Sequence, residues 1–337
     1  MELGACGQGS ASFNGTDTRP ENHTDVTMMR PPSCTQKCLS QTLGACVKNL
    51  DVQQILPFVI SAVVQAGQFL AQEYVRPGGR RGHGDKADID LEIEEALRAE
   101  LLNLLPCDWW GEETGHLLTG NSLCWVVDPN DGTSDFLRGY AGSAVSVGLL
   151  QGNVPVLGVV HAPVTAKGKS DCIAWAAGMD HLLRNGTQIR VDLSQQDLTD
   201  GSVVMVSTAA SGKPQINQEL CAPGDFYPMP SIAYRLARVA AGDGVCGVSL
   251  YPVSAHDVVA GHALLIGANG VLVDQDGRPI EYRTKAEMMK VSNRCFGGAP
   301  IACADLARRD WDRVFAKDAN EPQASSACPV TTDAKTR

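Results

Sequence analysis

Two carboxylates and a turn that contains a glycine follow a short apolar run before the middle of the chain. The run covers residues 125–127, and after it come, in order, Asp128, Pro129, Asn130, Asp131, Gly132, Thr133 and Ser134. The apolar residues predict a buried strand that delivers the acids to its exposed end. A glycine lets a ligand approach the main chain, and hydroxyls and amides at an expected helix start attract anions. Together these residues predict a hard metal ion that holds a phosphate.

A plain hairpin turn fits the same stretch, because Asn-Asp-Gly and Asp-Pro are both common turn sequences. Two more acidic groups favour chemistry instead. Glu112 and Glu113 follow a glycine, in a place that suits a shared metal or a general base, although an exposed turn fits them equally well. Asp257 stands at the start of a predicted helix that Ser254 caps.

The elements that must position these acids differ between the two halves of the chain. Helical spacing covers residues 52–74 and 88–102, and residues 144–150 and 154–160 predict a hairpin that continues as a meander to about residue 183. After residue 201, strands at 202–207, 245–250 and 270–274 alternate with helices at 231–241 and 254–266. We therefore expect an α+β half with an antiparallel sheet over residues 51–200 and an α/β half over 201–316.

The two ends of the chain and the stretch around the start of the second helix carry weaker signals. Residues 1–50 are rich in Gly, Ser, Thr, Pro and Asn, so we expect a disordered extension there and a disordered tail over 317–337. Residues 76–86 are too rich in glycine for regular structure and predict a mobile basic loop, which either reaches a substrate's anionic group or is merely solvated. We interpret the acids at the start of the predicted helix 88–102 as partners of the helix dipole. Asp90 is the exception, because it is also a candidate site residue.

Composition narrows the class of protein. The chain has 337 residues, 44% hydrophobic and 20% charged, and a net charge of -10, which argues against binding a nucleic-acid polymer by phosphate neutralisation. We read no membrane span and no signal peptide, and so expect a cytoplasmic protein. None of the 12 cysteines forms a CxxC pair; a zinc site at Cys6, Cys34, Cys38 and Cys46 is a minor alternative, since neither their spacing nor nearby histidines fit.

The order of the three acidic boxes is similar to that of a known family. Gly-Glu-Glu-Thr at 111–114, Asp-Pro-Asn-Asp-Gly-Thr at 128–133 and His-Asp-Val-Val-Ala-Gly-His at 256–262 resemble the inositol monophosphatase-like superfamily of magnesium-dependent, lithium-sensitive phosphomonoesterases. The resemblance covers roughly residues 53–315 and implies an αβαβα layered sandwich with the site between its halves. Dimers are common among such relatives, so a homodimer is expected.

The resemblance also implies two magnesium ions and a weaker third. Glu112, Asp128 and the carbonyl of Asn130 would bind one ion, Asp128, Asp131 and Asp257 the second, and Asp90 the third through water. Gly132, Thr133 and Ser134 would bind the phosphate, while Glu112, Thr133 and Asp131 form the catalytic set, with Thr133 and Glu112 orienting and deprotonating the attacking water. Two cations in such a site stabilise both the entering and the leaving oxygen, so no cysteine nucleophile is needed.

Departures from the family pattern leave the substrate open. Asp88 competes with Asp90 for the third ion, and His256 stands where relatives have Trp; we read it as a neutral structural histidine. Ser-Asp-Phe after the central box matches neither inositol phosphatases nor relatives acting on 3'-phosphoadenosine 5'-phosphate. Inositol monophosphate or a sugar phosphate is the first choice; a 3'(2'),5'-bisphosphate nucleotidase or a histidinol-phosphatase is the alternative, and Arg235 and Arg238 are candidates for a second phosphate. A non-catalytic regulator that binds metal or anion is the rival from another class.

Overall fold

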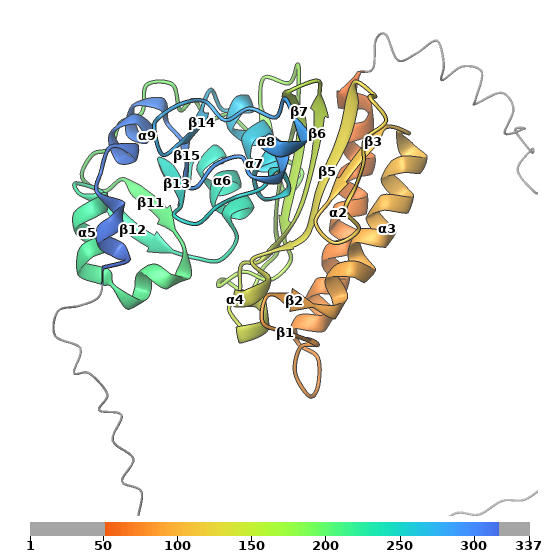
Figure 1. The fold of residues 1–337 in the computed structure, drawn as a ribbon, viewed down its shortest axis with the longest axis horizontal. Coiled ribbons are helices and arrows are strands. Elements are labelled where there is room, and N and C mark those ends of the chain that lie inside the picture. Colours follow the sequence, from red (N-terminus) through yellow and green to blue (C-terminus); the bar gives the residue numbers. More distant parts are fainter. Residues whose placement is uncertain (1–50, 317–337) are drawn as a thin grey trace, which may run out of the picture. The chain divides into compact units, whose positions relative to one another are not determined.

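The structure is a computed structural model that describes residues 51–316. The expected extension at 1–50, the expected tail at 317–337 and the four early cysteines therefore lie outside the described residues. Within them, five layers follow one another: helices, an eight-stranded sheet, helices, a five-stranded sheet and helices (Figure 1). This is the αβαβα layered sandwich that the family resemblance implies.

The eight-stranded sheet has the order β10-β9-β8-β7-β6-β5-β3-β4. Its neighbours pair antiparallel except β3 with β5, which run parallel and bring Gly111 opposite Val127. Because these two strands end side by side, the acids that follow them lie at the same edge. The strands are β3 (Asp108–Gly111), β4 (His116–Leu117), β5 (Leu123–Asp131), β6 (Ala144–Gln151), β7 (Val154–Ala162), β8 (Asp171–Ala176), β9 (Leu182–Arg184) and β10 (Thr187–Ile189).

The five-stranded sheet has the order β12-β11-β13-β15-β14 and is mixed. Strand β11 runs parallel to β12 and β13, whereas β15 pairs antiparallel with β13 and β14. The sequence predicted β11, β13 and β14 but not β12 or β15, which are four-residue strands without a clear apolar run. The strands are β11 (Val203–Val206), β12 (Asp225–Pro228), β13 (Cys246–Ser249), β14 (Val271–Asp274) and β15 (Cys295–Gly298).

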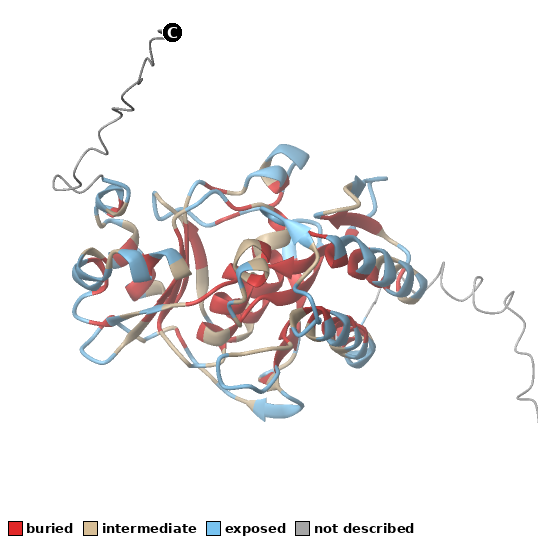
Figure 2. Cartoon of the chain, turned by 90° about the horizontal axis from the view of Figure 1, so that it is seen from below, coloured by how far each residue is buried: buried red, intermediate tan, exposed pale blue. Residues whose placement is uncertain are grey.

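Each helical layer covers one face of a sheet. Helices α2 (Val52–Tyr74) and α3 (Asp88–Leu104) cover the outer face of the large sheet, and α6 (Ile232–Ala240) and α7 (Ala255–Gly267) fill the space between the sheets. Buried residues concentrate on the inward faces of these helices (Figure 2). The remaining helices are α4 (Thr133–Arg138), α5 (Pro214–Cys221), α8 (Lys285–Met289) and α9 (Pro300–Ala307), with 3₁₀ turns at Thr208–Gly212 and Trp311–Val314.

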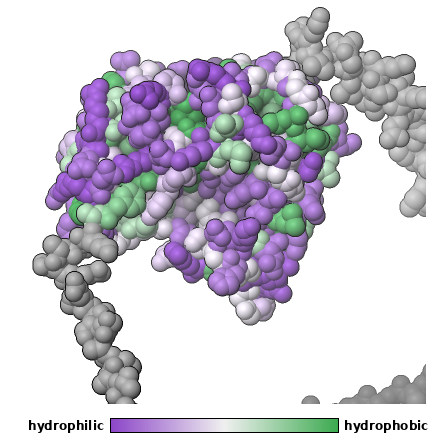
Figure 3. Space-filling view, viewed as in Figure 1, coloured by the Kyte–Doolittle hydropathy of each residue, from purple (hydrophilic) through white to green (hydrophobic). Residues whose placement is uncertain are grey.

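Helix α2 is the one described helix whose length and mean hydropathy of 1.5 would suffice to cross a membrane. The sequence reading had found no such stretch. In the structure the apolar face of α2 packs on α3 and on strands β6, β7 and β8, while its outward positions include five glutamines: Gln53, Gln54, Gln65, Gln68 and Gln72. This amphipathic pattern is that of a helix covering a core. The surface seen in Figure 3 is mainly hydrophilic, with separate apolar patches.

The glycine-rich segment 76–86 is more regular than the sequence predicted. Two short strands, β1 (Gly82–His83) and β2 (Lys86–Ala87), pair antiparallel within it. The backbone amide and guanidinium of Arg81 donate to the buried carboxylate of Glu73, and the Arg80 guanidinium lies 4.1 Å from the Tyr74 ring centroid. The prediction of no regular structure was therefore wrong. Residues 82–83 and 86–87 form a strand pair, and the side chains of Arg80 and Arg81 bind an aromatic ring and a carboxylate of the protein itself.

Candidate metal and phosphate site

Strand β5 delivers the central acids by continuing past its apolar run. Residues Leu123–Asp131 are all buried, and the pairing with β6 shifts register between Asp128 and Asp131. The carboxylate of Asp128 accepts the amide of Asn130 at 2.9 Å, which closes a tight local turn. This irregularity turns both acids toward the same space instead of to opposite faces of the sheet.

Asp128, Asp131 and Asp257 form one acidic group. Each offers a carboxylate oxygen, and these oxygens lie within 4.8 Å of one another. Asp257 comes from the first turn of α7, where its side chain also accepts the Ser254 amide in the predicted capping box. Two elements far apart in sequence, β5 and α7, thus bring oxygen ligands to one place.

Glu112 joins this group from the end of β3. Glu112 is exposed as a residue, but its carboxyl end is enclosed by protein and lies beside that of Asp128. Burial of the carboxyl, and then the charges of Asp257 and Glu113, raise its pKa to about 8. Burial also raises the pKa of Asp131 and of Asp257 to about 6 each, and that of Asp128 well above its usual range.

The donor set fits a hard divalent cation. Four crowded carboxyl groups with raised pKa values hold negative charge that nothing nearby neutralises fully. Magnesium prefers such oxygen ligands, and a bound cation would remove the repulsion between them. The pattern of residues is therefore that of a cation site.

Asp131 is held from the second half of the chain. Its Oδ2 accepts the Ser231 hydroxyl at 2.6 Å and the Ala233 amide at 2.5 Å. Sequence reasoning did not find either donor, since both lie about a hundred residues away; the helix-cap position of Ser231 was the one available signal. Ser231 itself has a φ of 50°, an uncommon conformation for a residue with a side chain.

Gly132 fits where no other residue would. Its φ is 97°, and a Cβ added there would lie 3.0 Å from the Ser231 amide nitrogen. The turn after Asp131 can therefore approach the start of α6 closely only with glycine. The amides of Gly132 and Thr133 and the side chain of Ser134 follow at this turn, beside the acidic group.

Asp90 is almost completely buried, whereas Asp88, the other candidate for the third ion, is exposed. The carboxylate oxygens of Asp90 accept hydrogen bonds from Asn130 Nδ2 at 2.9 Å and from the Thr133 hydroxyl at 3.2 Å. The same hydroxyl lies 2.8 Å from the Asn130 carbonyl oxygen, so one proton is shared between two acceptors. Burial raises the pKa of Asp90 to about 7.

Glu94 positions the Glu112–Glu113 turn, although the sequence reading gave it no role there. Its fully buried carboxylate accepts the amides of Glu113 and Thr114 and the Thr114 hydroxyl. A Cβ at Gly111 would overlap this carboxylate, which explains the glycine before the two acids. The signal in the sequence was an acid one helical turn after Asp90, on the same face of α3.

Arg235 is buried, and His256 is half-buried. Arg235 donates to the carbonyls of Ser231 and Val248 from a buried position, so its expected contact with a second phosphate is wrong. Burial lowers the pKa of His256, and its Nδ1 has no hydrogen-bond partner among the described residues. A neutral histidine is the state that this environment favours.

The layered fold and the grouped acids are those of a class of phosphatase. The structure of an inositol monophosphatase from Anabaena matches with a TM-score of 0.59 at 25% identity, covering 77% of this chain and 96% of that one. The model of the inositol monophosphatase family matches residues 51–304. The chain belongs to this family, whose members hydrolyse phosphate monoesters, and it is an enzyme of that kind.

Two curated relatives show the range within the family. One is the fructose-1,6-bisphosphatase/inositol-1-monophosphatase of Aquifex aeolicus, 30% identical over 239 residues, which cover 66% of this chain and 84% of the relative. Another is the 3'(2'),5'-bisphosphate nucleotidase of Aggregatibacter actinomycetemcomitans, 26% identical over 272 residues, which cover 77% and 96%. The resemblance that the sequence suggested is confirmed at the level of family and fold.

Proposed function

We propose that this protein is a magnesium-dependent phosphomonoesterase that hydrolyses a small phosphorylated metabolite, with inositol monophosphate or a sugar phosphate as the first choice. The observation that carries the proposal is the grouping of Asp128, Asp131 and Asp257 within 4.8 Å beside the Gly132–Thr133 turn. Acids alone would repel a phosphate. A site that pairs them with anion-seeking amides makes chemical sense when cations lie between them.

The proposed ligands follow the three elements that meet here. Glu112, Asp128 and the Asn130 carbonyl would hold one magnesium ion, and Asp128, Asp131 and Asp257 a second. Bound magnesium supplies positive charge that offsets the phosphate charge and lowers the pKa of a water molecule. A third ion that Asp90 holds through water stays a prediction, since the Asp90 oxygens already accept donors from Asn130 and Thr133.

The chain's own groups then orient the reaction. The amides of Gly132 and Thr133, with Ser134, would hold the phosphate oxygens. The Thr133 hydroxyl, fixed between Asp90 and the Asn130 carbonyl, has its oxygen free to accept a hydrogen bond from the attacking water. Glu112 is the proposed base for that water. Asp131 accepts hydrogen bonds from Ser231 and Ala233, and so holds the acids of the first half in position relative to the start of α6 in the second half.

Phosphate release from a panel of inositol, sugar, histidinol and 3'-phosphoadenosine 5'-phosphate substrates tests the proposal, with and without magnesium. Wild type should turn over at least one member only with magnesium, and Asp131→Asn should lose nearly all activity. Asp200→Asn is the matched control, because Asp200 is an exposed acid in a turn. Magnesium binding to folded protein without release from any member would favour the non-catalytic regulator.

A bisphosphate substrate is the second candidate. Two relatives are named for bisphosphates, and a cationic cavity lies beside the acidic group. We also propose a cytoplasmic homodimer without membrane or nucleic-acid partners, which sedimentation and cell fractionation test directly.

A further inference from the structure

The side chain of Asn130 has no part in the proposed reaction, although Asn130 stands between two acids of the site. Only its backbone carbonyl is a proposed ligand of an ion. The residue is fully buried, and its Nδ2 donates a hydrogen bond to Oδ1 of Asp90 at 2.9 Å, across forty residues of chain. Burying an amide costs free energy that its hydrogen bonds must offset. The contact with Asp90 is therefore the one that accounts for an amide at this position.

Protein donors fill the carboxylate of Asp90. Its Oδ2 accepts the Ala87 amide at 3.3 Å and the Thr133 hydroxyl at 3.2 Å, while its Oδ1 accepts the amide of Asn130. An ionised carboxylate offers about four lone pairs, and three of them are engaged here.

The space around Asp90 is closed as well. The residue is only 1% exposed, whereas a water molecule that links a carboxylate to an ion needs room and roughly two to four polar partners. The residues around Asp90 therefore do not fit the third ion that the family resemblance implies there, even through a bridging water molecule.

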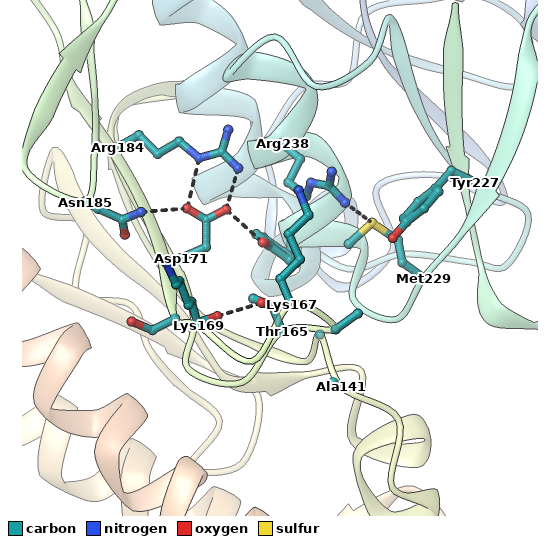
Figure 4. A pocket seen from close by; sticks show the side chains of 14 residues that line it. Ala141, Thr165, Lys167, Lys169, Asp171, Arg184, Asn185, Tyr227, Met229 and Arg238 are labelled. Atoms are coloured by element: carbon teal, nitrogen blue, oxygen red, sulfur yellow. Dashed lines mark hydrogen bonds and ion pairs between the residues drawn. The ribbon is translucent and has the colours of Figure 1, made fainter.

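Asp171, another buried acid, does not offer an alternative place for that ion. It faces a cavity of about 220 Å³, and in Figure 4 it is bonded to Arg184 and Asn185. It also accepts the hydroxyl of Tyr234 on α6. Two lysines line the same cavity, and their charge repels a cation.

We propose that the side-chain amide of Asn130 takes the place of an ion at Asp90, so that this enzyme works with two magnesium ions. The proposal deepens the proposed phosphatase function and rests on it. The Asn130 amide is part of the chain, so it donates to Asp90 at every magnesium concentration. An ion bound weakly through water would not.

The same residue also fixes Thr133. The carbonyl oxygen of Asn130 lies 2.8 Å from the Thr133 hydroxyl, and Asp90, which the Asn130 amide holds, lies 3.2 Å from that hydroxyl. The surroundings of Thr133 are thus complete without an ion at Asp90. Asn130 is a positioning residue for Asp90 and Thr133, since its side chain does not touch the reacting atoms.

Counting bound ions tests the proposal without relying on turnover. Equilibrium dialysis against manganese, which accepts the same oxygen ligands as magnesium, gives the number of ions per chain. Wild type and Asp90→Asn should both bind two ions, because Asp90 holds none. Asn130→Ala should bind a third, since it frees Oδ1 of Asp90 and leaves space for about one water molecule. The double variant Asn130→Ala/Asp90→Asn should return to two.

Asn217→Ala is the matched control. Asn217 is also buried, at 1% exposure, and the Oδ1 atoms of both asparagines have no hydrogen-bond partner among the described residues. The amide of Asn217, however, donates to the Lys213 carbonyl at 2.8 Å and not to an acid. A purely structural role for Asn130 predicts that both alanine variants lose stability and that both still bind two ions.

A third ion in wild type that Asp90→Asn removes would overturn the proposal. An unchanged number of ions in folded Asn130→Ala would overturn it too, because the amide would then keep nothing out. If Asn130→Ala does not fold, the comparison of wild type with Asp90→Asn still decides. The expected ion numbers without release of phosphate from any substrate would support the role of Asn130 and reject the phosphatase function.

Discussion

Removing metal should make the stability of this protein fall as the pH rises, and Asp131 should contribute to the part of the fall between about pH 4 and about pH 6. Burial, followed by the charge of Asp257, raises the Asp131 pKa from 3.8 to about 6. The folded state therefore binds more protons than the unfolded state between about pH 4 and about pH 6. The contribution of Asp131 to the free energy of unfolding decreases with rising pH in that window, and this contribution is lost above it.

The size of the effect follows from the shifts. A shift of about two units corresponds to about 3 kcal/mol at 1.36 kcal/mol per unit. Asp257 has a similar shift, to about 6, but the two acids interact, so their contributions overlap. We expect the metal-free protein to lose about 3–5 kcal/mol from this pair between about pH 4 and about pH 8.

Urea unfolding in EDTA at several pH values measures this directly, with Asp131→Asn as the comparison. Buried His161 and His256, whose pKa values burial lowers, change stability with pH in the opposite sense. The difference between wild type and variant cancels that background. Asp131→Asn should remove about 3 kcal/mol of the fall between about pH 4 and about pH 6, while the falls that Glu112 and Asp90 contribute at higher pH remain. Magnesium should stabilise wild type more at about pH 8 than at about pH 5. A variant with the same pH dependence as wild type would refute the reasoning.

Three further predictions concern single residues. Thr133→Val should lower kcat by about 10²–10⁴-fold, whereas Thr133→Ser, which keeps the hydroxyl, should stay close to wild type in the same assay. Gly132→Ala should cost about 1–3 kcal/mol more in urea unfolding than Gly120→Ala, because Gly120 has a similar positive φ of 87° but open space around it; equal costs would exclude the close approach to Ser231. Arg235→Met should cost about 1–3 kcal/mol, since the buried Val248 carbonyl loses the guanidinium donor, whereas the Ser231 carbonyl keeps the backbone amide of residue 235. It should leave the preference between mono- and bisphosphates unchanged; a changed preference at wild-type stability would contradict the buried position.

Strong local patterns in the sequence predicted much of the fold. The helical spacing at 52–74 and the cap of α7 gave helices at the right places, because buried faces and capping side chains act over a few residues. Four-residue strands such as β12 and β15 escaped prediction. Their backbones become strands through pairing with β11, β13 and β14, and that pairing has no local signal.

The candidate site, too, was predicted only where its residues are close together in the sequence. Asp128 and Asp131 could be identified as site residues because they lie on one strand and the turn at its end. The donors that fix them were not, since Ser231 meets Asp131 across a hundred residues of chain and Glu94 meets the Glu113 amide across nineteen. Such contacts depend on tertiary packing, so the sequence shows acids and glycines in order but not what holds them.

The acidic group can form only when the two halves are packed together. Asp128 and Asp131 come from the large sheet, Asp257 comes from α7, and the start of α6 holds Asp131. Helix α7 packs directly on β6 and β7, next to the strand that carries the first two acids. A cation bound by all three would therefore oppose separation of the layers, while the unneutralised acids favour it. Metal affinity and the packing of α6 and α7 on the large sheet should consequently rise and fall together in variants of either.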